Sequence, residues 1–151
     1  MNPEVLRFRT RLDVLYKRAE ELEEMELQSH WARYLCVLTS GFLESSIQAI
    51  YGRYAIDKSA PHVANFVQQR LRYFQNAKMG NICSLAGEFN PEWGEQLGDI
   101  DEELKDAVNS VVANRHLIAH GRDVGISFAR MKEYYPRIRR VVEIIQDQCD
   151  A

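Results

Sequence analysis

The residues best suited to chemistry lie in one short stretch, Asn114-Arg115-His116-Leu117-Ile118-Ala119-His120-Gly121-Arg122. It contains two of the four histidines of the chain. Histidine, with an unperturbed pKa of about 6.5, can give or take a proton at neutral pH. Arginine is always charged, and its planar guanidinium matches a phosphate or a carboxylate. The stretch therefore combines groups for proton transfer with groups for binding an anion.

The spacing of these residues leaves several interpretations open. Arg115 and His120 are five residues apart, so on one straight helix they diverge by about 140° and about 7.5 Å. Arg115 also falls on an apolar stripe, where it could be a core or interface arginine paired with Glu44. The two histidines could be cations that interact favourably with a helix C-terminus. His116 and His120 are four apart and could share a metal ion, but no third ligand of matching spacing is evident.

Apolar residues at helical spacing predict the elements that position this stretch. We expect helices at about 3–27, about 30–56 with Ser29 as N-cap, 59–76, from Asp99 or Asp101 to Gly121, and 127–147. The second helix is apolar on more than one side and should be the most buried. The first helix should direct Leu12, Leu15, Tyr16, Ala19, Leu22 and Met25 inward, and the third Val63, Phe66, Val67, Leu71 and Phe74.

Glycine and proline mark the irregular parts of the predicted fold. Residues 80–98 contain four glycines together with Asn90 and Pro91, which predicts short helical turns but no long element. Pro136 should bend or divide the last helix. A weak extended segment is expected at 124–127. The sequence thus predicts an all-α fold, a bundle of four or five helices forming a single domain over residues 1–151, with an irregular segment before the helix that carries the histidines.

Composition narrows the class of protein. With 46% apolar and 27% charged residues, the chain is typical of one globular domain and not of a disordered tail. It has no apolar run long enough to cross a bilayer and three cysteines without a CxxC pair. Charges near its N-terminus, where a signal peptide needs an apolar stretch, lead us to expect no signal peptide. We expect a protein of the cytoplasm with no membrane association. The net charge of −3 argues against nucleic-acid binding by bulk positive charge, so any such contact must be local.

The stretch R-H-L-I-A-H-G-R, from Arg115 to Arg122, resembles the R-x4-H motif of the HEPN superfamily, small helical domains many of which are metal-independent ribonucleases. The chain after the motif is also similar to the stand-alone RiboL-PSP and MAE branches, because a glycine, a short link and a tyrosine-bearing amphipathic helix come in that order. A long second helix with an acid in an apolar context, Phe42-Leu43-Glu44-Ser45-Ser46, fits as well. The resemblance covers most of the chain.

The resemblance implies a homodimer in which Arg115 and His120 of both chains line one cleft. His120 would be the general acid or base at the ribose 2′-hydroxyl or the leaving oxygen, and Arg115 would hold the scissile phosphate. His116 fills the usually polar position after the arginine and would orient the cleft or contact RNA. Asn114, Glu44 and Arg122 are further candidates for RNA contacts or for supporting the catalytic pair.

The implied function is a metal-independent endoribonuclease that cuts single-stranded RNA without a cofactor, in a toxin-antitoxin, stress or phage-defence system. An antitoxin or regulatory protein would be a further partner. The alternative is a non-catalytic dimeric HEPN-type module for helical interaction or nucleotide binding. In one branch a tyrosine two places after the motif histidine receives a nucleotide; Arg122 stands there in this chain, which argues against silencing by tyrosine modification. A basic cluster, Arg137, Arg139 and Arg140, could join Arg122 in a phosphate path.

Overall fold

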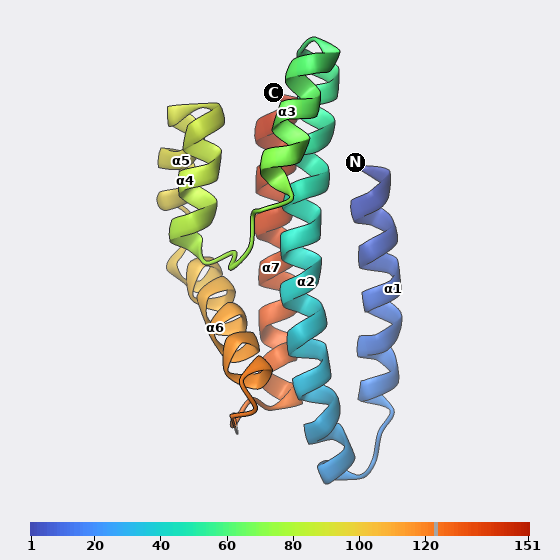
Figure 1. Cartoon of the computed structure of the whole chain (residues 1–151). Coiled ribbons are helices and arrows are strands. Elements are labelled where there is room, and N and C mark those ends of the chain that lie inside the picture. Colours follow the sequence, from blue (N-terminus) through green and yellow to red (C-terminus); the bar gives the residue numbers. More distant parts are fainter. Residues whose placement is uncertain (123) are drawn as a thin grey trace.

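The computed structural model describes residues 1–122 and 124–151, and these ranges form seven α-helices and no strand (Figure 1). In chain order the helices are α1 (Pro3–Glu20), α2 (Met25–Lys58), α3 (Pro61–Leu71), α4 (Met79–Phe89), α5 (Pro91–Gly98), α6 (Glu102–Ala119) and α7 (Phe128–Asp150). The long helices α2 and α7 pack together, with α1 on one side of α2 and α6 on the other. The all-α prediction is confirmed, although the helices are more numerous than expected.

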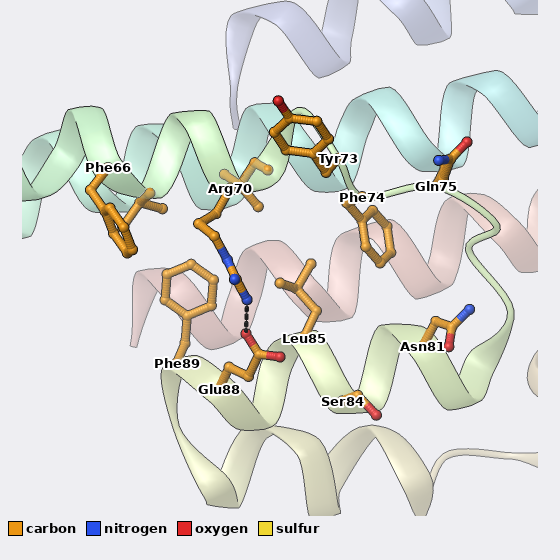
Figure 2. A pocket seen from close by; sticks show the side chains of 12 residues that line it. Phe66, Arg70, Tyr73, Phe74, Gln75, Asn81, Ser84, Leu85, Glu88 and Phe89 are labelled. Carbon is orange, nitrogen blue, oxygen red and sulfur yellow. Dashed lines mark ion pairs between the residues drawn. The ribbon is translucent and has the colours of Figure 1, made fainter.

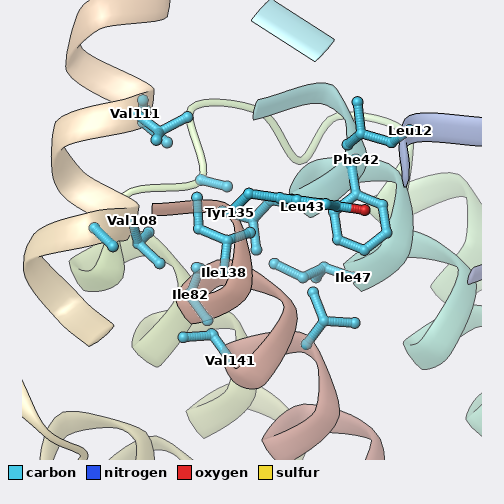
Figure 3. Packing of buried hydrophobic residues seen from close by; sticks show 14 of the residues in the cluster. Leu12, Phe42, Leu43, Ile47, Ile82, Val108, Val111, Tyr135, Ile138 and Val141 are labelled. Carbon is cyan, nitrogen blue, oxygen red and sulfur yellow. The ribbon is translucent and has the colours of Figure 1, made fainter. Parts of the chain in front are cut away.

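The hydrophobic core lies where α2, α6 and α7 meet, as Figure 3 shows. Its fully buried side chains include Leu43 and Ile47 of α2, Val108 and Val111 of α6, and Ile138 of α7. Each such side chain stabilises the fold by about 1.5–3 kcal/mol relative to an exposed one. Helix α6 is thus held by both long helices. No helix in the described ranges is long and apolar enough to cross a membrane.

The three cysteines are free thiols that belong to this packing. Cys36 is fully buried on α2, and its thiol donates a hydrogen bond to the carbonyl of Val111 on α6 at 3.5 Å. Burial raises the pKa of Cys36 to about 12 and that of Cys149 to about 12. The pKa of the half-buried Cys83 is also raised by burial. These thiols are packing groups of the interior.

The junction between α1 and α2 differs from the prediction. The first helix ends at Glu20 instead of continuing to 27, and the second begins at Met25, so Ser29 lies inside α2 and is not its N-cap. Met25, expected on the inward stripe of the first helix, is exposed at the start of α2. The apolar periodicity continues across the turn between the two helices, so periodicity alone does not reveal where α1 ends.

Helix α3 is shorter and less buried than predicted. It ends at Leu71, and the chain then passes through Asn76, which has a positive φ of 57°. Leu71 is buried as expected, but Val63 is 52% and Phe66 is 65% exposed. The reason is that α3 packs mainly on α2, so only a narrow stripe of its surface is covered.

Residues 80–98, predicted to be irregular with short helical turns, form two short and regular helices, the hairpin of α4 and α5. Asn90 both ends α4 and caps α5, where its side chain accepts a hydrogen bond from the Glu92 backbone N–H. At Gly94 a β-carbon would lie 2.8 Å from the Cys83 carbonyl oxygen and 3.1 Å from the α-carbon of Gly87. The glycines thus let the two helices approach closely, and they do not interrupt them.

The observed bounds of α6 and α7 agree more closely with the bounds predicted from the sequence. Asp101 is the residue before α6, although its side chain makes no capping bond, and two acids occupy the first turn. Ser127 caps α7 by accepting a hydrogen bond from the Arg130 backbone N–H at 3.1 Å. Helix α7 runs unbroken through Pro136, so the predicted division does not occur. The expected extended segment at 124–127 forms no strand.

Candidate functional site

The end of α6 is fixed by its own backbone hydrogen bonds. The N–H of Gly121 donates to the Ile118 carbonyl at 3.0 Å, and the N–H of Arg122 donates to the Leu117 carbonyl at 3.0 Å. This pair of bonds is the Schellman arrangement, which requires a left-handed residue after the helix. Gly121 supplies it with a φ of 69°. Gly121, the glycine directly after His120, therefore terminates the helix.

The three principal candidates all lie on the surface of this helix end. Arg115, His116 and His120 are exposed. The imidazole rings of His116 and His120 are in contact, with centroids 4.4 Å apart and planes at 61°. Arg115 lies on the preceding turn, five residues before His120. The side chains that can transfer protons and bind an anion are thus open to solvent and to a ligand.

Glu44 approaches this site from α2. Burial raises the pKa of the Glu44 carboxyl, whereas the nearby Arg115 guanidinium and a hydrogen bond from the Asn76 backbone N–H lower it. The carboxylate is half-buried and lies within electrostatic range of Arg115. It therefore links three elements: α2, the segment between α3 and α4, and the end of α6.

The remaining sequence candidates occupy different positions. The Asn114 side-chain amide donates to the Ser110 carbonyl at 2.8 Å and lies back along α6. Arg122 is exposed, directly after the helix end. The structure thus brings Glu44 near Arg115 and His116 against His120, whereas Asn114 is engaged with its own helix.

The basic residues of α7 have acidic partners within the chain. Each of the five cations in the first half of α7, the basic cluster included, has a carboxylate within 4.0 Å: Arg130 with Glu133, Lys132 with Glu20, Arg137 with Glu103, Arg139 with Asp13, and Arg140 with Glu143. A local excess of positive charge in the sequence therefore does not become one on the surface. This weakens the expectation that Arg137, Arg139 and Arg140 supply a phosphate path.

A second basic region lies in the middle of the chain, where the basic residues are few and widely spaced. Residues 58–87, here called the acid-free segment, contain Lys58, Arg70, Arg72 and Lys78 and no aspartate or glutamate. All four cations are exposed. The signal that identifies this region is the absence of acids over thirty residues of an acidic protein, not a cluster of bases.

Glu44→Gln is expected to change how stability depends on pH. Because the pKa of Glu44 is raised in the folded chain, the folded state holds its proton more tightly than the unfolded state does. The resulting stability is present below the unfolded pKa and is lost as pH rises through the folded pKa. Glutamine keeps an acceptor for the Asn76 N–H but does not ionise. Urea unfolding from pH 4 to 7 should show the variant gaining on the wild type as pH rises; parallel curves would contradict the assignment.

Comparison with known protein families identifies the family of the chain. The family described as RiboL-PSP-HEPN matches residues 11–151, nearly the whole chain and all of the helix end that carries Arg115 and His120. No curated protein and no solved structure matches. Among the described residues no group of three or more histidine, cysteine or acidic side chains is arranged to hold a metal ion. With a helical fold and the R-x4-H residues exposed at the end of α6, the chain belongs to the RiboL-PSP-HEPN family.

Proposed function

We propose that the protein is a metal-independent endoribonuclease of a toxin-antitoxin, stress or defence system, cutting single-stranded RNA at a site shared by two copies of the chain. Nuclease-type function is typical of the HEPN family in general. The observation that carries the proposal is the exposure of Arg115, His116 and His120 together at one helix end. Side chains that neither pack nor cap are free to act on a substrate.

The two structural interpretations of these residues do not explain their exposure. Arg115 is exposed and so is not a core arginine, although Glu44 lies within electrostatic range of it, as a paired arginine requires. The end of α6 needs no imidazole to bind its carbonyls, because backbone N–H groups of residues 120, 121 and 122 already bind those of His116, Ile118 and Leu117. A favourable interaction of the two histidines with the helix C-terminus is compatible with the proposal.

The chemistry is set by the residue types. The 2′-hydroxyl attacks the adjacent phosphorus as His120 takes its proton, and the 5′-oxygen leaves as it receives a proton. The bond between phosphorus and the 5′-oxygen breaks, giving a 2′,3′-cyclic phosphate and a 5′-hydroxyl. Arg115 stabilises the charge that develops on the phosphoryl oxygens. Two copies supply two histidines, so one can act as base and the other as acid.

An exposed stripe on α2 supports the two-copy site. Tyr34, Val37 and Gly41 are exposed and lie at helical spacing on the approach to Glu44. Tyr34 is 51% exposed and packs edge-on against Trp31 at 5.8 Å. Helices α2 and α6 touch at this level through the Cys36 thiol. A second copy on this stripe would bring its own Arg115 and His120 next to those of the first.

Gly41→Leu is expected to prevent dimerisation. A β-carbon at Gly41 meets nothing within 4 Å in the single chain, and leucine is the better helix former, so the monomer should fold at least as well. A side chain there would obstruct a copy packed on the stripe. Sedimentation should give about twice 17.5 kDa for the wild type and 17.5 kDa for the variant. A wild type that sediments as a monomer would contradict the shared site.

The experiment that tests the function is RNA cleavage by purified protein in excess EDTA. We expect cuts in single-stranded RNA and fragments that end in a 2′,3′-cyclic phosphate and a 5′-hydroxyl. DNA of the same sequence lacks the 2′-hydroxyl and should remain intact. Activity that is lost in EDTA and restored by zinc or magnesium would replace the proposal with a metal mechanism at His116 and His120.

A further inference from the structure

A groove of about 870 Å³ lies between α3 and α4, outside the candidate site (Figure 2). Phe66 and Arg70 of α3 and Phe74 of the following segment point toward Leu85, Glu88 and Phe89 of α4. Polar side chains, Gln75, Asn81 and Ser84, line the end nearest the segment between the two helices. The volume lies in the range of binding pockets.

Two aromatic rings of this groove are too exposed to be core residues. Phe66 is 65% exposed and Tyr73 is 81% exposed. Phe74 and Phe89 are half-buried and form the floor. Exposed aromatic rings at a groove present flat faces on which unpaired bases stack without preference for sequence.

Arg70 gives the groove a cation for an anionic occupant. The groove is formed largely by the acid-free segment, and Arg70 is the one cation among the residues that line it. Arg70 is 3.6 Å from Glu88, the one acid of the lining, but both side chains are well exposed, so the pair is weak and Arg70 can turn to a phosphate. A phosphate at Arg70 would compete with Glu88 alone, whereas Arg72 lines a different hollow, beside α1 and α2.

The groove connects to the candidate site through its polar end. Gln48 of α2 donates to the carbonyls of Leu71 and Phe74 at 3.0 and 3.1 Å, which holds the segment after α3 against α2. Two residues on, the Asn76 N–H binds Glu44, which is within electrostatic range of Arg115. Gln75, at the polar end of the groove, is thus one residue before the backbone N–H that joins this segment to Glu44.

We propose that the groove between α3 and α4 binds a single-stranded part of the RNA substrate, with bases stacked on Phe66 and Tyr73 and a phosphate at Arg70. The inference rests on the proposed function for its substrate, and it adds where the uncut part of the strand lies. A duplex would not be bound in this way, because its bases are already stacked on one another. The groove thereby selects single strands before the phosphate reaches Arg115.

The test is binding of a fluorescent single-stranded RNA of about 12 nucleotides by the His120→Ala protein, which cannot consume it. Adding Phe66→Ala or Tyr73→Ala should in each case weaken binding by about fivefold to 100-fold. Val63→Ala, on an exposed residue of α3 outside the groove, is the matched control and should change nothing. Because all three side chains are exposed, circular dichroism should stay constant.

Charge variants give the inference a second readout of opposite sign. Arg70→Gln should weaken binding and reduce the slope of log affinity against log salt by about 0.7, the value for one phosphate contact on a single strand. Glu88→Gln should tighten binding, because it removes the acid that competes for Arg70. Equal binding by all these variants would overturn the proposal.

The experiments distinguish failure of the proposal that the groove binds RNA from failure of the proposal that the protein is a nuclease. If the wild type cuts no RNA but His120→Ala still binds single strands through Phe66 and Tyr73, the groove stands and the catalytic proposal falls. If the wild type cuts RNA and the groove variants bind normally, the groove proposal falls alone. If Phe66→Ala converts a dimer to a monomer in sedimentation, the groove is an interface between copies and the RNA proposal is overturned.

Discussion

His120→Ala should reduce RNA cleavage by about 100- to 10,000-fold, because it removes the group that transfers the proton. Arg115→Ala should have a comparable effect, since the developing phosphoryl charge loses its charge-assisted hydrogen bonds. Arg115→Lys should not restore full activity, because an ammonium cannot bind two phosphoryl oxygens through a rigid fork. Initial rates on one RNA substrate, measured in EDTA, give these factors directly.

Both alanine variants should remain folded, which makes the loss of activity interpretable. The side chains are exposed and the helix end is held by backbone bonds that neither variant touches. His62→Ala, at an exposed histidine of α3 away from both the site and the α2 stripe, controls for a general effect of removing an imidazole. Cleavage that persists in both motif variants would point to a contaminating nuclease and would remove the case for this site.

Tyr51→Ala is expected to destabilise the fold by about 3–5 kcal/mol, as for other large aromatic residues. The Tyr51 ring is fully buried on α2 and stacks on Phe89 of α4 with centroids 4.6 Å apart and on Trp93 of α5 at 6.4 Å. These contacts are a main attachment of the α4 and α5 hairpin to the bundle. Urea unfolding should report the loss, and a change below about 1 kcal/mol would show that the hairpin is held by other contacts.

Tyr51→Phe is the matched control, because it keeps the ring and removes only the hydroxyl. Within the described part of the chain this buried hydroxyl has no hydrogen-bond partner. A buried polar group without a partner costs about 1–3 kcal/mol, so phenylalanine should be neutral or stabilising. The two variants together separate ring packing from polarity. Marked destabilisation by phenylalanine would reveal a bond made by the hydroxyl in solution.

The helical class could be predicted from the sequence because apolar periodicity is a local property. Features that depend on how the helices pack against one another could not be predicted in this way. Gly87 and Gly94 have the composition of a loop, yet they are the points where α4 and α5 touch, which only the packed pair reveals. Val63 and Phe66 follow the same period as buried residues, but α3 packs mainly on α2. Periodicity identifies a face without showing that anything covers it.

The same distinction between local features and features that depend on packing applies to the candidate site. Arg115, His116 and His120 are neighbours in sequence and could be selected from spacing and resemblance. The approach of Glu44 depends on how α2 packs beside α6 and on the Asn76 N–H, which lies 32 residues further along the chain. The neutralisation of Arg139 by Asp13 likewise joins opposite ends of the chain. Charge counted along a sequence therefore differs from charge presented to a ligand.

The interior position of the thiols has a consequence for chemical labelling. With a pKa of about 12, Cys36 holds only about one thiolate for every 10⁵ thiols at pH 7, and the thiolate is the form that alkylating reagents attack. Cys149 has the same low reactivity. One cysteine introduced at an exposed position such as Gln75 would react orders of magnitude faster than either. A reporter dye can therefore be attached beside the groove without first removing these two native cysteines.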